Sequence, residues 1–381
     1  MISTAKTIGL GILFYIVIFF GAREIYLRFF QQERYYSLPP SAVSPTLSNA
    51  PTPTATIVAG VPSTGKEQIS QSAGNAVTSV EQLFTGQMAA INPEKDISLL
   101  VTGDVLTARS VNNTMTKRSD FTWPFIHTKE LTSTADISFI NLETPLIKEC
   151  PLKVDGMIFC GNPKSIEGLQ FAGIDVVNIA NNHASNYRPE GVLETVATLK
   201  QAGLQVSGQT GSNLALVQVK DTTFGFLGYN EVNIQDGITL ADDETIKNEI
   251  AEAQEKADIV VVQFHWGNEY TRTPSNNQKR LAHLAIDAGA DMIVGNHPHW
   301  FQPVEFYSGK LIMYSHGNFV FDQMWSQETR EGIIARYYFE DKKLIRIEFT
   351  PIIIENYGQP RIANEAEKNR IIEELKNVSL L

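Results

Sequence analysis

Short apolar runs that each end in a polar cluster recur along the chain from Asp96 onward. They are rich in β-branched residues and read ISLLV before TGD, DISFI before NLE, DVVNIA before NNH, DIVVVQF before HWG, and DMIV before GNHPH. Continuous apolar runs of this length are typical of strands that are buried on both faces of a sheet. The pattern therefore restricts the chain to folds built on buried sheets whose strands end in polar side chains.

Helical patterns lie between several of these runs and stop at glycine. They read SIEGLQFAG, PEGVLETVATLKQAG and NNQKRLAHLAIDAG, and they end at Gly173, Gly203 and Gly289. Glycine suits a helix end, and alternating strands and helices predict an α/β sheet with its ligand site beyond the carboxyl ends of the strands. After Gly332, the sequence IIARYYFEDKKLIRIEFTPIII predicts two long antiparallel strands joined by a turn at 341–343, and a terminal helix follows from Glu365.

The amino-terminal part of the chain has a different composition. Residues 7–22 contain the uncharged run IGLGILFYIVIFFGA, slightly short of the ~20 apolar residues that span a bilayer. We predict a transmembrane anchor at 1–30, and a cleaved signal peptide is the competing interpretation. Residues 35–65 carry no charge and are dense in Pro, Ser, Thr and Ala, so we predict a disordered linker at 31–95 and one folded domain at 96–381.

Charge and cysteine content limit the partners and the location. The formal net charge of −11 and the lack of a Lys/Arg cluster exclude nucleic acid as a partner. The chain has two cysteines, Cys150 and Cys160, which are close enough to form one local disulfide, although two unrelated reduced thiols are equally compatible with the sequence. The uncharged linker favours export, so we predict a single-pass protein of the cell membrane with an extracytoplasmic domain.

The polar side chains at the strand ends share one chemistry. Carboxylates, amides and imidazoles are the ligands of divalent metals such as Mn, Fe and Zn, and a two-metal site also needs a bridging carboxylate. Each residue also has a structural explanation: Asp104 as a helix cap, Glu143 as a surface acid, and Asn182 with His183 as a turn. Pro298 predicts an extended segment that points its two neighbours the same way. In chain order the strand ends present Asp104, Glu143, Asn182, His183, His265, His297 and His299.

The joint pattern resembles one known family. The clusters GDVLTAR, NLETPL, ANNHASNYRPEG, HWGNEYTRTPSNNQ, GADMIVGNHPH and SHGNFVFDQ are similar to those of the CapA family, the poly-γ-glutamate capsule synthesis proteins of the calcineurin-like metallophosphatase superfamily. The resemblance extends from about Ile97 to Ile354. It implies a four-layer α/β/β/α sandwich with a site for one or two divalent metals at the strand ends.

The resemblance also implies a role for each matching residue. Asp104 resembles the ligand of the first motif, Glu143 the bridging carboxylate, and Asn182 the amide ligand. His265 and His297 match ligands of the second metal, and His299 matches a ligand of the first metal. His183 looks like the acid–base histidine that donates a proton to the leaving group, and Arg109 matches the arginine that closes the first motif.

The chain departs from the superfamily pattern at Leu106, where many metallophosphatases have a histidine. The first metal would therefore have one ligand fewer. His316 lies in SHGNF and either adds a ligand or packs in the core. We expect Arg272, Glu269 and Asn318 to contact the substrate, because Arg109 or Arg272 can hold an anionic oxygen through charge-assisted hydrogen bonds.

Three functions fit these observations. The first is a membrane-anchored, metal-dependent hydrolase or transferase that acts on an anionic cell-envelope polymer or a phosphorylated small molecule. The second is a non-enzymatic assembly component that binds the polymer or a membrane synthetase complex, and Leu106 favours it. The third is a cytoplasmic phosphatase, against which the uncharged linker argues.

Overall fold

The computed structural model describes residues 76–85 and 88–379. The predicted anchor and most of the predicted linker lie outside these residues. Among the described helices, none is both long and apolar enough to cross a bilayer. Within the predicted linker, α2 (Val80–Thr85) buries Leu83, and the Val77 N–H donates to the Leu344 carbonyl at 2.9 Å. The folded unit therefore extends upstream of Asp96.

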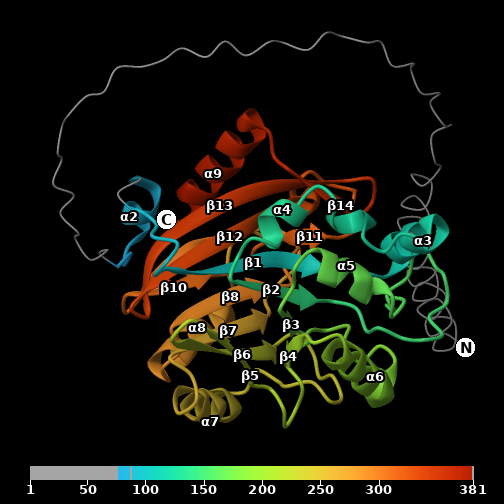
Figure 1. The fold of residues 1–381 in the computed structure, drawn as a ribbon, viewed down its shortest axis with the longest axis horizontal. Helices are drawn as coiled ribbons and strands as arrows, with labels where there is room; N and C mark the ends of the chain where they lie inside the picture. Colours follow the sequence, from blue (N-terminus) through green and yellow to red (C-terminus); the bar gives the residue numbers. More distant parts are fainter. Residues whose placement is uncertain (1–75, 86–87, 380–381) are drawn as a thin grey trace, which may run out of the picture. The chain divides into compact units, whose positions relative to one another are not determined.

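The first sheet has the strand order β14-β13-β12-β1-β2-β3-β4, with β11 paired to the end of β1 (Figure 1). Strands β1 to β4 are parallel, and β12 to β14 are antiparallel, so the predicted hairpin after Gly332 is confirmed and forms one side of this sheet. The bounds are β1 (Ile97–Val105), β2 (Ile137–Leu142), β3 (Val176–Asn178), β4 (Gln205–Ser207), β11 (Asn318–Val320), β12 (Glu331–Glu340), β13 (Lys343–Glu355) and β14 (Gln359–Ile362).

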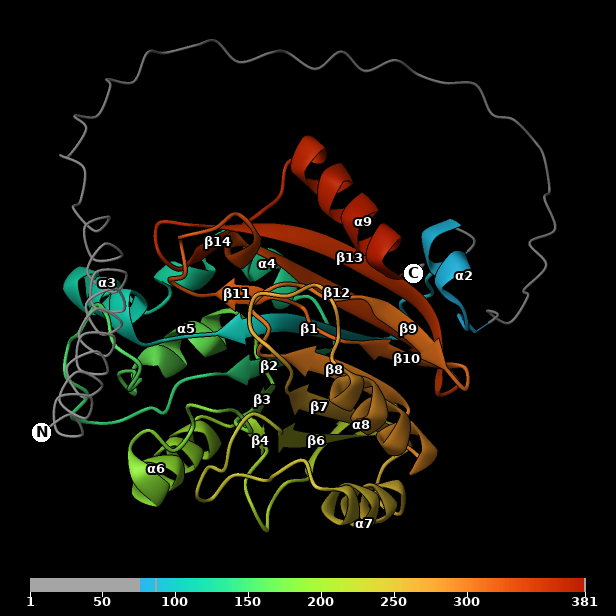
Figure 2. The ribbon, with the colours of Figure 1, turned by 180° about the vertical axis from the view of Figure 1, so that it is seen from behind.

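The second sheet has the order β5-β6-β7-β8-β10-β9 (Figure 2). Strands β6, β7, β8 and β10 are parallel, and β5 and β9 are antiparallel edges. The sequence pattern does not reveal β6, because Gly225 and Gly228 interrupt its apolar run. A Cβ at Gly228 would lie 1.8 Å from Asn178 Oδ1, so glycine permits the close approach of β6 to the first sheet. The bounds are β5 (Ala215–Val219), β6 (Thr222–Asn230), β7 (Ile259–His265), β8 (Met292–Asn296), β9 (Val304–Tyr307) and β10 (Lys310–Met313).

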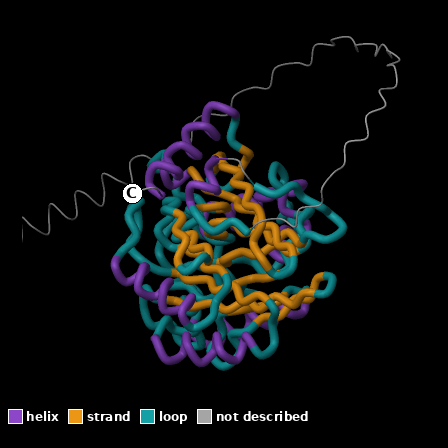
Figure 3. The backbone as a smooth tube through the Cα atoms, turned by 90° about the vertical axis from the view of Figure 1, so that its left-hand side faces the viewer, coloured by secondary structure: helices purple, strands orange, loops and turns teal. Residues whose placement is uncertain are grey.

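Alternating side chains along the strands divide the apolar interior into three cores. Leu99 and Val101 of β1 enter the core between the sheets, whereas Leu100 enters the core beneath α3, α5 and α6. On β7, Val261 faces the other sheet and Val262 faces α7 and α8. The strands occupy the middle of the molecule and the helices its outside (Figure 3), in the predicted four-layer order.

The helices of the outer layers follow the strands that they cover. The terminal helix α9 (Glu365–Ser379) packs on β13 and places Ile371 and Leu375 in the inter-sheet core, as the sequence predicts a helix from Glu365. The others are α3 (Arg109–Arg118), α4 (Lys129–Thr132), α5 (Ser165–Phe171), α6 (Arg188–Gln201), α7 (Asp243–Gln254) and α8 (Asn276–Asp287). The predicted stops at Gly173, Gly203 and Gly289 follow α5, α6 and α8, each with positive φ.

The start of α8 carries a capping box that gives a first prediction. The Ser275 hydroxyl accepts from the Gln278 N–H at 3.1 Å, and the Gln278 side chain accepts from the Ser275 N–H at 2.9 Å. Replacing Ser275 with Ala should lower the free energy of unfolding by about 1 kcal/mol and the melting temperature by about 2–4 °C. Lys279→Ala, an exposed change in the same helix, is the control and should leave the melting temperature within about 1 °C. Equal melting temperatures for Ser275→Ala and wild type would refute a stabilising cap.

Candidate metal centre

The predicted site residues meet where the carboxyl ends of both sheets face each other. Asp104 is the last residue but one of β1, and Glu143 directly follows β2. His265 is the last residue of β7, and His297 directly follows β8. The structure therefore brings together side chains that are separated by almost 200 residues, because parallel strands present their carboxyl ends at a common edge.

Asp104, Glu143 and His299 form the centre of the cluster. Each offers one ligand atom, and these atoms all lie within 4.8 Å of one another. All three side chains are buried. Burial raises the pKa of the Asp104 carboxyl from 3.8 to about 7. Burial, and then the charge of Asp104, raise the pKa of Glu143 well above its ordinary value. Two buried carboxylates side by side are electrostatically unfavourable without a neighbouring cation.

Unpaired polar atoms in the cluster fit a divalent cation. Both carboxylate oxygens of Glu143 and the Nδ1 atom of His297 are buried, and none has a hydrogen-bond partner among the described residues. Buried polar atoms in folded proteins are nearly always paired, so these atoms call for a ligand. Burial lowers the pKa of His297 to about 4 and that of His299 well below its ordinary value, so both rings are neutral at pH 7 and keep a lone pair.

His299 is oriented by an amide behind it. Its Nδ1 atom lies 2.9 Å from Asn318 Oδ1, and the Asn318 amide donates to the Thr329 carbonyl at 2.9 Å and to Gln323 Oε1 at 3.2 Å. With both amide hydrogens committed, Asn318 Oδ1 accepts from His299 Nδ1–H, which leaves the lone pair on Nε2. Asn318 is fully buried. Its contacts therefore give it a role in orienting His299, and its contact with substrate stays a prediction.

Asn182 and His265 contact each other in this structure. The Nε2 atom of His265 lies 2.8 Å from Asn182 Oδ1. The same ring lies 3.9 Å from both Asp104 Oδ1 and Glu143 Oε1, so it belongs to the cluster. Because Asn182 Oδ1 is an acceptor, His265 Nε2 donates in this contact and could bind a cation only after the hydrogen bond opens, whereas Asn182 Oδ1 keeps a second lone pair.

Asn141 connects the carboxylate to a row of asparagines that sequence reasoning missed. Its Nδ2 atom donates to Asp104 Oδ1 at 2.7 Å, and its Oδ1 atom accepts from Asn178 at 2.9 Å and from Asn181 at 3.3 Å. Asp104, Asn141 and Asn178 are register partners across β1, β2 and β3. The available signal was an asparagine in each of two apolar runs, Asn141 in FINLE and Asn178 in VVNIA.

The backbone at His297 and His299 differs from the prediction. Pro298 predicts an extended segment, but the φ angles of the two histidines are +96° and +58°. The His297 N–H donates to Asp104 Oδ2 at 3.1 Å, and the Pro298 carbonyl accepts from the Tyr270 N–H at 2.9 Å. These two bonds hold the turn, and the two imidazole rings lie 6.0 Å apart at 49° rather than side by side.

His183 lies at the edge of the cluster with a defined tautomer. Its Nδ1 atom lies 3.0 Å from Asn186 Oδ1, an acceptor, so Nδ1 carries the hydrogen and Nε2 the lone pair. Nε2 lies 3.9 Å from Glu143 Oε1. Burial lowers the pKa of His183 to about 4. The ring is therefore neutral at pH 7, with its lone pair on Nε2.

Arg109 is the cation beside the carboxylates. It is the first residue of α3, and its guanidinium pairs with the buried carboxylate of Asp322, a residue that sequence reasoning missed although it lies in the quoted cluster SHGNFVFDQ. The charge of Arg109 opposes the upward shift in the pKa of Glu143. Its Nε atom is buried and has no hydrogen-bond partner among the described residues.

Arg272 and His316 do not join the strand-end cluster. Arg272 donates through Nε to Glu374 of α9 at 2.8 Å and through Nη1 to the Phe301 carbonyl at 3.1 Å, and its Nη2 atom has no hydrogen-bond partner among the described residues. Glu269 is exposed on the loop after β7, and its charge helps to raise the pKa of Glu143, so its contact with substrate stays a prediction. Fully buried His316 lies 3.1 Å from the Tyr337 hydroxyl and packs in the core. Leu106, at the position of the missing histidine, is fully buried as well.

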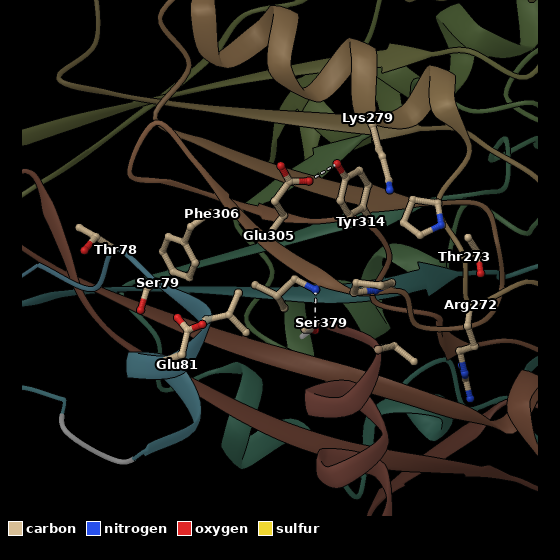
Figure 4. Close-up of a pocket in the computed structure, with 15 residues that line it drawn as sticks. Thr78, Ser79, Glu81, Arg272, Thr273, Lys279, Glu305, Phe306, Tyr314 and Ser379 are labelled. Atoms are coloured by element: carbon tan, nitrogen blue, oxygen red, sulfur yellow. Dashed lines mark hydrogen bonds between the residues drawn. The ribbon is translucent and has the colours of Figure 1, made fainter. Parts of the chain in front are cut away.

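Two further features of the described residues are a disulfide and a cavity. Cys150 and Cys160 form a disulfide that closes a loop between β2 and α5. A cavity of about 600 Å³ lies elsewhere, between α2, the start of α8, β9 and the end of α9 (Figure 4). Arg272 and Lys279 line that cavity, but Asp104, Glu143 and the strand-end histidines do not. The side chains that fit a metal site therefore lie at the strand ends and not around this cavity.

The chain is similar to two capsule biosynthesis proteins and to one solved phosphatase structure. The chain is 33% identical over 292 residues to the PGA biosynthesis protein CapA of Bacillus subtilis (strain 168), which covers 72% of this chain and 76% of the relative. It is 28% identical over 326 residues to the capsule biosynthesis protein CapA of Bacillus anthracis, which covers 79% of each chain. A solved structure of a phosphatase from Mycoplasma pneumoniae is 13% identical, with a TM-score of 0.46 over 74% of this chain and 99% of that one.

The match to a family extends over most of the described domain. The family described as bacterial capsule synthesis protein PGA_cap matches residues 98–323, from the first residues of β1 to the loop after β11. This range includes every residue of the cluster and the Arg109–Asp322 pair. The chain therefore belongs to the bacterial capsule synthesis protein family, PGA_cap.

Proposed function

We propose that this protein is a metal-dependent hydrolase or transferase that acts on an anionic capsule polymer. The observation that carries the proposal is the pair of buried, unpartnered oxygens on Glu143, beside Asp104 and His299 within 4.8 Å. A neutral histidine, His183, and a partly buried cation, Arg109, flank the same carboxylate. A purely structural cluster would not leave its central carboxylate without a partner.

The chain offers enough ligand atoms for one or two ions of Mn, Fe or Zn. Asp104, Glu143 and His299 would hold the first ion, and His297 would contribute to a second together with Asn182 and His265 once their mutual bond opens. A divalent cation at such a site supplies positive charge that acidifies water and polarises the scissile group.

The remaining residues would bind and move the reacting groups. His183 accepts a proton at Nε2 from the attacking water or hydroxyl and returns it to the leaving group, as a general base and then a general acid. Asn186 keeps the ring in the required tautomer. Arg109, fixed by Asp322, holds an anionic oxygen of the substrate through its unpaired Nε–H.

The substrate class follows from the relatives and from charge. The Bacillus relatives are named for PGA and capsule biosynthesis, so we propose poly-γ-glutamate or a similar polymer, cleaved or transferred at an amide or phosphoester bond. A protein with a net charge of −11 needs Arg109 and the bound metal to offset its repulsion of a polyanion. The apolar run at residues 7–22 and the disulfide support a membrane-anchored, extracytoplasmic location near a synthetase complex.

A non-enzymatic assembly role is the alternative. Leu106 is packed in the core, so no side chain at that position can complete the first metal site. Asn182 and His265 bind each other, which suits a site that is not permanently loaded. In that case the cluster would recognise polymer or a partner without turnover.

One experiment separates the two functions. The full-length protein, purified in detergent and loaded with Mn²⁺, is assayed for bound metal by mass spectrometry and for hydrolysis of p-nitrophenyl phosphate and of poly-γ-glutamate. The hydrolase proposal predicts at least one ion per chain and turnover that EDTA abolishes. Bound metal without turnover of either substrate would favour the assembly role. A folded protein that binds no metal would refute the metal centre itself.

A further inference from the structure

We infer that Phe159 is the positioning residue for His183, and that the Cys150–Cys160 disulfide keeps Phe159 in place. The inference deepens the proposed function, because it rests on the proposed role of His183 in proton transfer. It concerns the loop of residues 151–159, which joins the two cysteines beside the metal centre.

The Phe159 ring contacts both residues that we assign to proton transfer and anion binding. Its centroid lies 3.7 Å from that of His183, with the two rings stacked at 19°. The Arg109 guanidinium carbon lies 4.6 Å from the same ring centroid. One aromatic side chain thus restrains the imidazole plane and the guanidinium at the same time.

The Phe159 backbone reaches His183 by a second route. Its N–H donates to Asn186 Oδ1 at 2.6 Å, and the same oxygen lies 3.0 Å from His183 Nδ1. Asn186 is therefore oriented from the loop side and from the histidine side. If Phe159 moves, the stacking contact and the acceptor that fixes the His183 tautomer are disturbed together.

The rest of the loop adds few contacts, among them a hydrogen bond between the Met157 backbone and His183. Residues 151–158 are all exposed, whereas Phe159 is 2% exposed and Cys160 is 6% exposed. Leu152, Val154, Met157 and Ile158 are each more than half exposed, so they do not pack the loop onto the domain. The Val154 carbonyl accepts from the Ser110 hydroxyl at 3.2 Å, and the Gly156 carbonyl lies 3.5 Å from Arg109 Nη1.

The disulfide is the covalent restraint on the approach of Phe159, beside the backbone hydrogen bonds of Gly161 to Pro145 and Ile147. It ties Cys160, the neighbour of Phe159, to Cys150, whose N–H donates to the Ile147 carbonyl at 3.1 Å. Opening the bond would free an exposed loop whose one buried apolar side chain is the one that packs at the site. The chain has two cysteines, so a reductant acts on this bond alone.

The test compares Phe159→Ala with Leu152→Ala, an exposed change in the same loop, in the full-length protein in detergent. Three quantities are measured: carbethoxylation of His183 by diethyl pyrocarbonate, with exposed His127 as internal reference; Mn²⁺ affinity by calorimetry; and kcat and KM for p-nitrophenyl phosphate. Phe159→Ala should raise the His183 modification rate at least threefold and lower kcat by about 10- to 100-fold. Mn²⁺ affinity should stay within about twofold, because Phe159 contacts none of the proposed ligands.

Wild-type protein reduced with TCEP should show the same rise in His183 modification. An unchanged His183 rate in Phe159→Ala, or the same change in Leu152→Ala, would overturn the positioning role. An unchanged rate after complete reduction would overturn the role of the disulfide. If wild type has no turnover but Phe159→Ala exposes His183 as expected, the proposed reaction fails and the positioning inference stands.

Discussion

Removing the charge of Glu143 is expected to abolish stabilisation by metal while stabilising the metal-free protein. In Glu143→Gln, the amide cannot replace a carboxylate as an anionic ligand, and the mutation also removes a buried charge that has no partner among the described residues. A metal present at 1,000 times its dissociation constant stabilises a folded protein by about 4 kcal/mol, roughly a 10 °C rise in melting temperature for a domain of this size. Wild type should show this rise with Mn²⁺, and Glu143→Gln should not.

The metal-free protein should also depend on pH in a defined direction. Burial raises the pKa of Asp104 from 3.8 to about 7, so the folded state binds more protons than the unfolded state between those values. The Asp104 carboxyl therefore makes stability fall as pH rises from about 4 to 7. The lowered pKa values of His183, His297 and His299 make stability rise with pH up to about 6.5. The net fall is thus expected above pH 6.5, and metal should reverse it. Differential scanning fluorimetry in EDTA and in Mn²⁺, from pH 4 to 8, measures both effects.

Glu373→Gln, an exposed change on α9, is the matched control and should behave as wild type. A full metal-induced rise in Glu143→Gln would contradict a role for this carboxylate as ligand. A metal-free Glu143→Gln less stable than wild type would contradict the electrostatic argument, because it would show that the buried carboxylate contributes favourably by itself.

The sequence was most informative where burial and chemistry coincided. Runs such as DIVVVQF and DISFI are buried on both faces, which makes them recognisable as strands, and the polar residue that follows each run lies at the common sheet edge. The sequence alone therefore predicts that one cluster contains Asp104, Glu143, His265 and His299. Strand β6 escaped detection because two glycines interrupt its apolar run, and one of them, Gly228, permits the packing of one sheet against the other, which is a tertiary requirement.

The residues that were missed or misplaced depend on contacts that no local pattern records. Arg272 carries the charge expected of a substrate-binding residue, but Glu374, about 100 residues later, binds its guanidinium. Asp322 and Asn186 act through Arg109 and His183, and only the folded chain shows those pairs. The turn at His297 depends on Asp104, which overrides the extended preference of the residue before proline.

Replacing His183 with Ala is expected to abolish turnover while leaving the metal in place. Removing a general acid–base group lowers kcat by about 10²- to 10⁴-fold. His183 comes no nearer than 3.9 Å to Glu143 Oε1, and the central triad of Asp104, Glu143 and His299 does not include it. Metal content and the Mn²⁺-induced rise in melting temperature should therefore match those of wild type.

The control for this variant is His283→Ala, which removes an imidazole that stacks on Tyr307 and lies 2.7 Å from Glu305, outside the cluster. Its kcat for p-nitrophenyl phosphate should equal that of wild type. If His183→Ala kept wild-type kcat with metal bound, the proton would have to move through water or another group, and the tautomer set by Asn186 would have no catalytic meaning. If His183→Ala lost its metal, the ring would be a metal ligand. Loss of the ion alone would then explain the loss of turnover.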